Sequence, residues 1–74
     1  GWTSSDLKQL YEAFGFRIRS GSNHDIVSHP EYPQIRDTLP RQNKELPKAY
    51  ASTALKNIEE LLSLQTGNEG EDDG

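Results

Sequence analysis

The chain contains no cysteine, and only 31% of its residues are hydrophobic. The absence of cysteine excludes disulfides, thiolate chemistry and cysteine-ligated zinc, and it fits a reducing compartment. No apolar run approaches the roughly 20 residues of a membrane-spanning helix, and no signal sequence opens the chain. We therefore expect a soluble, cytoplasmic protein. Its 74 residues allow one domain and no deep substrate cavity, so an active site should lie at a sheet edge or turn.

The formal net charge of −4 comes entirely from the end of the chain. Residues 67–74 hold four acidic residues and no basic or apolar side chain, whereas residues 1–66 carry eight basic and eight acidic residues. Because it has nothing to bury, segment 67–74 should be a disordered acidic tail after a single domain of residues 1–66. Such a tail can mimic a nucleic acid or regulate binding, but we interpret it as a solubilising terminus.

Two amphipathic helices are predicted, one near each end. Apolar residues recur at helical spacing after a polar capping segment, which predicts a helix over about 5–14. Gly15 is well placed to end this helix in the left-handed conformation. A second, stronger pattern predicts a helix over about 47–64, with Pro47 in its first turn.

Three short strands are predicted between the helices. Residues 16–19 and 35–39 alternate between apolar and polar side chains, and residues 25–28 follow a Gly-Ser-Asn turn. Connections of hairpin length favour antiparallel pairing, and both helices must cover one face of the sheet. The expected fold class is therefore α+β, in the order helix, three-stranded antiparallel sheet, helix, which is the architecture of a double-stranded-RNA-binding domain. Its core is expected to contain Leu10, Phe14, Ile18, Leu39, Ala54, Leu55 and Ile58.

Three arginines should gather on the other face of the sheet. Arg17, Arg19 and Arg36 have the opposite strand parity to the apolar residues of their strands. Guanidinium groups suit the oxygens of a phosphate backbone. The alternative is a solvated face that blunts edge-to-edge pairing, and parity alone favours it.

His24, at the exit of the predicted turn, is the candidate catalytic residue. An imidazole titrates near neutral pH, and RNA cleavage needs a base, an acid for the leaving oxygen, and cations for the phosphate. A lone histidine at a turn is also often structural or solvated. The second histidine, His29, precedes Pro30 and is expected to fix the strand exit. Because residues five apart in a strand point to opposite faces, no metal site is expected.

The order of short motifs resembles that of the HicA family, small ribonucleases of bacterial and archaeal toxin–antitoxin pairs. The motifs are Gly15-Phe16, Arg19, Gly21-Ser22 with His24, His29-Pro30, Leu39-Pro40 and Lys44-Glu45-Leu46, and the resemblance covers about residues 7–64. The chain departs from the family pattern at two places. Asn23 is inserted between the Gly-Ser pair and the histidine, and Val27 stands where an aromatic residue is common.

The resemblance implies an mRNA interferase, a toxin that binds and cleaves mRNA without a metal or other cofactor. It implies His24 as the general acid/base and a HicB-like antitoxin as the protein partner that covers the site. The residues expected to hold RNA are Arg17, Arg19, Gly21, Ser22, Arg36, Arg41 and Lys44. Two alternatives stay open: a non-catalytic RNA-binding module of the same fold, and a protein-interaction domain whose arginines meet an acidic partner.

Overall fold

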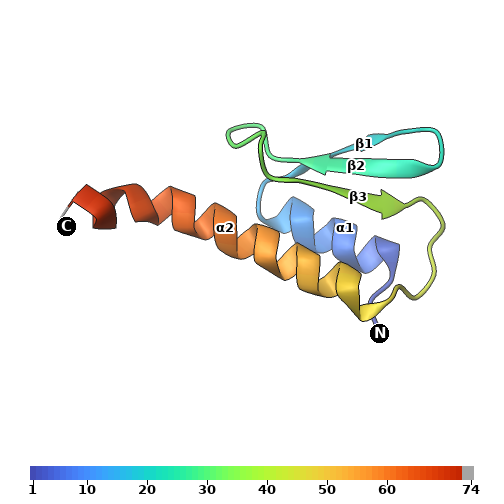
Figure 1. Cartoon of the computed structure of the whole chain (residues 1–74). Helices are drawn as coiled ribbons and strands as arrows, with labels where there is room; N and C mark the ends of the chain where they lie inside the picture. Colours follow the sequence, from blue (N-terminus) through green and yellow to red (C-terminus); the bar gives the residue numbers. More distant parts are fainter. Residues whose placement is uncertain (73–74) are drawn as a thin grey trace.

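The computed structural model of the chain describes residues 1–72. The elements are α1 (Ser4–Ala13), β1 (Arg17–Ser20), β2 (His24–Ser28), β3 (Arg36–Pro40) and α2 (Lys48–Asp72). The strands form one antiparallel sheet in the order β1-β2-β3, and both helices lie on the same side of it (Figure 1). The expected α+β fold is confirmed, and the other face of the sheet is left uncovered by helices.

Residues close to its two ends determine where helix α1 begins and ends. The Asp6 backbone N–H donates to the Thr3 hydroxyl at 3.1 Å, and the Thr3 N–H donates to the Asp6 carboxylate at 3.0 Å. This reciprocal capping box satisfies donors at the helix start and holds the pKa of Asp6 below its ordinary value. At the other end, Gly15 has a φ of 87°, the left-handed conformation that the sequence predicted for it.

Helix α2 is longer than expected. It begins directly after Pro47 and continues to Asp72, past the predicted end at residue 64, so that its last turns project beyond the sheet (Figure 1). The disorder expected for residues 67–74 stays a prediction, and residues 73–74 lie outside the described residues. Within the described part of the chain, neither helix combines the length and the apolarity that crossing a bilayer requires.

The core lies between the helices and the sheet. Its buried apolar residues are Leu7, Tyr11, Phe16, Val27, Ile35, Leu39, Leu46, Ala54, Ile58 and Leu61. Three of the predicted core residues are among them, and Leu10 and Ile18 pack against them half-buried. The prediction was wrong for Phe14, which is 37% exposed, and for Leu55, which is 53% exposed. Phe14 follows the last helical residue of α1, and Leu55 lies outside the narrow stripe that α2 turns inward.

A polar network crosses this core. The Tyr11 hydroxyl donates to the Asp37 carboxylate at 2.6 Å and accepts from the Asn57 side-chain amide at 3.0 Å. The three residues therefore join α1, β3 and α2. Burial raises the pKa of Tyr11, and the bond to Asp37 raises it further, so the hydroxyl keeps its proton and remains a donor.

Two adjacent leucines of α2 test the position of the core. Leu61 is 1% exposed and Leu62 is 43% exposed. Leu61→Ala should lower the free energy of unfolding by about 2–5 kcal/mol because it leaves a cavity, and Leu62→Ala should cost well under half of that. Urea unfolding followed by circular dichroism measures both. Equal losses would contradict the packing of α2 described above.

Candidate functional site

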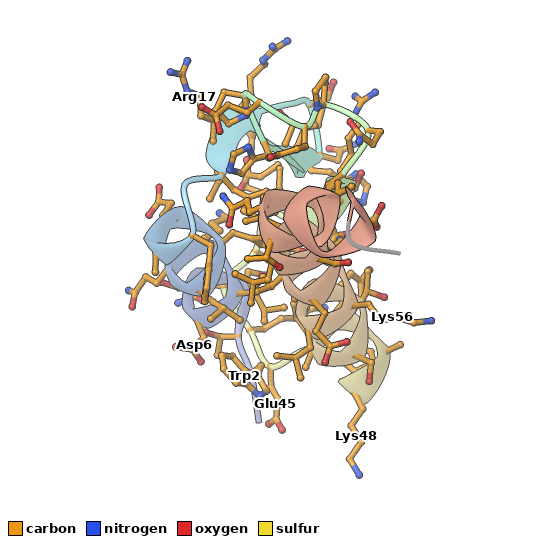
Figure 2. All side chains as sticks on the ribbon, turned by 90° about the vertical axis from the view of Figure 1, so that its left-hand side faces the viewer. Trp2, Asp6, Arg17, Glu45, Lys48 and Lys56 are labelled. Carbon is orange, nitrogen blue, oxygen red and sulfur yellow. The ribbon has the colours of Figure 1, made fainter. Side chains whose placement is uncertain are left out.

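The uncovered face of the sheet carries the predicted arginines in register. Arg17 and Arg36 flank Ser28 in one cross-strand row, and Arg19 shares the next row with Ile26. All three arginines are exposed. Figure 2 shows Arg17 at the sheet side of the molecule, far from the lysines labelled on α2. The parity argument is therefore correct about where the arginines lie.

This face carries no strand carboxylate. The two acidic residues of the strands, Asp25 and Asp37, have the opposite parity and face the helices. Among residues 1–67, none of the three arginines forms an ion pair. Although the chain has a net charge of −4, the arginines of the strands lie on the uncovered face of the sheet and the carboxylates lie on the face toward the helices. The uncovered face is a positively charged surface, which attracts anions.

His24 lies on the same face at the end of the sheet. It opens β2, is exposed, and pairs across the ladder with Pro40. Because Arg19 pairs with Ile26, two residues along β2, Arg19 and His24 are diagonal neighbours at about 7–8 Å, within reach of one long side chain. His24 contributes to a shallow hollow of about 360 Å³, which is lined by Gly21, Ser22, Asn23, His24, Ile26 and Thr38.

His29 is separated from His24 and buried on the other side. It is 5% exposed, and its ring packs edge-on against Phe16 with ring centroids 5.0 Å apart. Its Nδ1 accepts the backbone N–H of Glu31 at 3.1 Å, which holds the chain as it leaves β2. This position matches the structural role expected from the sequence. Among the described residues, no three His, Asp or Glu side chains are grouped as a metal ion would require.

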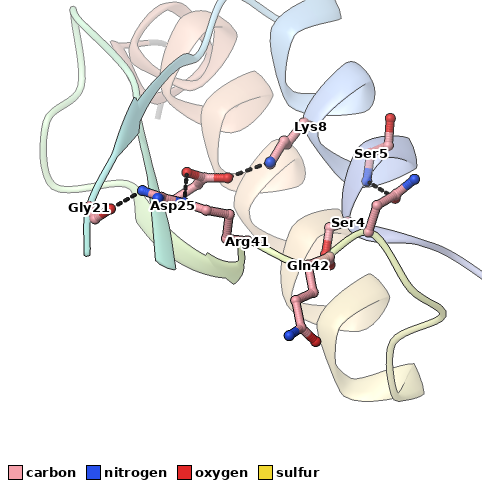
Figure 3. Close-up of polar contacts among 8 residues, drawn as sticks. Ser4, Ser5, Lys8, Gly21, Asp25, Arg41 and Gln42 are labelled. Carbon is pink, nitrogen blue, oxygen red and sulfur yellow. Dashed lines mark hydrogen bonds and ion pairs between the residues drawn. The ribbon is translucent and has the colours of Figure 1, made fainter. Parts of the chain in front are cut away.

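A buried carboxylate, which the sequence analysis did not single out, supports the turn beneath His24. Asp25 is 3% exposed and forms ion pairs with Lys8 of α1 and, at 3.7 Å, with Arg41 (Figure 3). The hydrogen bond from Lys8 holds the pKa of Asp25 below its ordinary value of 3.8, in spite of burial, which acts in the opposite direction. The signal in the sequence was an acidic residue at an inward position of a strand, where a charge needs partners.

Arg41 anchors the turn itself. Its guanidinium donates to the Gly21 carbonyl, and its backbone N–H donates to the Asn23 carbonyl at 3.4 Å. Through its contacts with Gly21, Asn23 and Asp25, Arg41 joins the β1–β2 turn to the loop after β3. The structure therefore gives Arg41 intramolecular partners, where the sequence led us to expect a phosphate ligand.

The loop after β3 forms a second and larger cavity beside the turn. It has a volume of about 550 Å³ and is lined by Ser22, Asn23, Pro40, Arg41, Gln42, Lys44, Leu46, Pro47 and Tyr50. The Ser4 hydroxyl donates to the Gln42 carbonyl at 2.9 Å, and the Ser5 N–H donates to the Asn43 side chain at 3.1 Å, which fixes the loop to the start of α1 (Figure 3). Of the residues expected to hold RNA, Ser22, Arg41 and Lys44 line this cavity, whereas Arg17, Arg19 and Arg36 lie on the sheet face.

No protein-family model, curated protein or solved structure matches the chain. The resemblance to HicA toxins therefore rests on the short motifs given above. The geometry of the fold itself places three arginines and His24 on one face of the sheet, and two hollows beside the turn that precedes His24.

The buried ion pairs of Asp25 predict a pH-dependent contribution to stability. Because the folded-state pKa is lowered, the contribution is complete above pH 3.8 and is lost as the pH falls through the folded-state value. Asp25→Asn should lower the Tm most at pH 5–7, and the difference from the parent should shrink below pH 3.8. Thermal unfolding across this range measures it, with Glu59→Gln as a control that removes an exposed carboxylate. A pH-independent difference for Asp25→Asn would contradict the ionic role.

Proposed function

We propose that this chain is an RNA-binding endoribonuclease of the HicA kind, an mRNA interferase. One observation carries the proposal: three arginines and an exposed histidine share the uncovered face of the sheet, from which both strand carboxylates are turned away. Such a face attracts a polyanion and holds a proton-transfer group beside the cations.

Binding is proposed to act mainly through the RNA backbone. Each guanidinium presents a planar set of donors that matches two phosphate oxygens, and contacts of this kind position RNA without reading its bases. The row of Arg17 and Arg36 spans the sheet, with the two backbones about 10 Å apart across β2. Arg19 lies one row closer to His24, so a strand that crosses the face meets the cations first and the imidazole at the end of the sheet.

Cleavage is assigned to His24 as the general acid/base. In RNA cleavage a base accepts the proton of the ribose 2′-hydroxyl or of an attacking water, and an acid donates a proton to the leaving oxygen. An imidazole can serve in either step near neutral pH. Arg19, the diagonal neighbour of His24, is proposed to stabilise the charge that develops on the phosphate. The mechanism requires neither a metal nor another cofactor.

The resemblance adds a protein partner to the proposal. A HicB-like antitoxin would cover the arginine face and block His24. A partner that competes with RNA for this face must present carboxylates to the same guanidinium groups. A non-catalytic RNA-binding module would use the arginines without His24, and a domain that binds only an acidic protein would use them without RNA. RNA binding and RNA cleavage, measured separately, distinguish these three functions.

Reversal of one arginine tests RNA binding. Arg19→Glu should weaken binding of a labelled RNA and reduce the salt dependence of the affinity by about one phosphate contact. Lys56→Glu is the matched control, because it makes the same charge change on α2, away from the sheet face (Figure 2). Fluorescence anisotropy at several salt concentrations measures both. Equal affinities of Arg19→Glu and the parent at every salt concentration would show that the arginine face is only solvated.

Removal of the imidazole tests catalysis. His24→Gln should abolish RNA cleavage while changing the Tm and the RNA affinity little, because the side chain is exposed and is not one of the proposed phosphate ligands. Cleavage by the parent should persist in EDTA. Gel analysis of a labelled mRNA fragment measures the products. Undiminished cleavage by His24→Gln, or loss of parent cleavage in EDTA, would contradict a histidine mechanism, whereas binding without cleavage by the parent would identify an RNA-binding module.

A further inference from the structure

We infer that the 550 Å³ cavity between the β1–β2 turn and the loop after β3 receives one unpaired nucleobase, so that the substrate is single-stranded RNA. This inference rests on the proposed RNA binding and deepens it. The fold alone suggests recognition of an RNA duplex by shape. The cavity indicates instead a strand whose base is free to leave the stack.

The lining of the cavity suits a nucleobase. Tyr50 and the neighbouring Pro40, Leu46 and Pro47 supply apolar surface, and a half-buried tyrosine ring is a platform on which a base can stack. Asn23 and Gln42 supply side-chain amides, which can donate to and accept from the polar edge of a base. The volume lies within the range of about 300–1,000 Å³ that small-molecule pockets occupy.

The cavity also adjoins the shallow hollow beside His24, the proposed catalytic residue. Ser22 and Asn23 line both this cavity and the shallow hollow around His24, so the turn forms a shared wall between them. Lys44, exposed at the cavity, adds a cation for the phosphate of the bound nucleotide. A strand that follows the arginine face past His24 reaches the cavity with its next nucleotide.

The cavity is built as a fixed feature of the fold. The turn is held by Arg41, whose guanidinium is bound to Asp25 and Gly21, and the loop is held by the bond from Ser4 to the Gln42 carbonyl. The Gln42 carbonyl is thereby occupied, and its side-chain amide has no hydrogen bond among those of residues 1–67. Asn23, the residue inserted relative to the family pattern, lies at the junction of the two hollows and is the residue best placed to select the base.

The test combines a change in the protein with a change in the RNA. The affinities of the parent and of Tyr50→Leu are measured for three kinds of labelled RNA. These are a short single strand, the same strand in a duplex, and a series of single strands in which one nucleotide, at a different position in each, is abasic. Tyr50→Leu keeps apolar volume but removes the ring. Tyr32→Leu makes the same change in the loop between β2 and β3, at the opposite end of the sheet, and is the matched control.

The parent should bind the single strand more tightly than the duplex, and one abasic position should weaken binding about tenfold. Tyr50→Leu should weaken binding of the intact strand about tenfold and should be insensitive to the abasic position. Tyr32→Leu should behave as the parent does. Asn23 is exposed, so Asn23→Ala should leave the core intact. This variant should change the relative affinities for strands that differ in the base that enters the cavity.

Several results would overturn the inference. If Arg19→Glu weakens binding while every abasic strand binds as the intact strand does, the RNA-binding proposal stands and the base cavity is refuted. Equal or tighter binding of the duplex refutes it as well. If the parent binds no RNA, both proposals fail. A Tm close to that of the parent establishes that Tyr50→Leu is folded, and the abasic series with the parent decides the matter independently of that variant.

Discussion

The ion pairs of Asp25 are the constraint on which the geometry of the site depends. A single buried carboxylate on the inner face of β2 binds Lys8 of α1 and Arg41 of the loop after β3. Since Arg41 also holds Gly21, the same carboxylate fixes the β1–β2 turn from which His24 emerges. A small domain has little apolar surface to bury, so these polar contacts add to the packing that positions the turn.

The fold was predictable from local patterns, and the site only in part. The capping residues, the left-handed glycine and the alternation of the strands each depend on residues that are close together in the chain. The order of the elements and the face that carries Arg17, Arg19 and Arg36 could therefore be predicted from the sequence. Periodicity does not reveal how wide a helical stripe the neighbouring elements cover, which is why Leu55 was misassigned. Contacts such as Arg41 with Asp25 join residues distant in the chain, and no local pattern encodes their pairing.

The role of Arg41 illustrates how an assignment by residue type differs from one by position. When only the sequence is known, an arginine after a strand is interpreted as a phosphate ligand, because the guanidinium group matches the geometry of phosphate oxygens. In the structure its guanidinium is engaged by a carboxylate and a carbonyl. Arg17, Arg19 and Arg36 have no ion-pair partner among residues 1–67. The cations that the fold leaves available for an external anion are those without an ion-pair partner, and these three arginines lie together on the sheet face.

Asn23, which is inserted relative to the HicA motif, lies in the β1–β2 turn directly before His24. The turn accommodates Asn23, and the ladder pairs Ser20 with Asp25 on either side of it. His24 remains at the first position of β2, with the Gly21 N–H donating to its carbonyl at 2.7 Å. Asn23 lines both the hollow beside His24 and the larger cavity. Under the proposed function, the added residue leaves the proton-transfer group in place and changes the surface that the adjacent nucleotide meets.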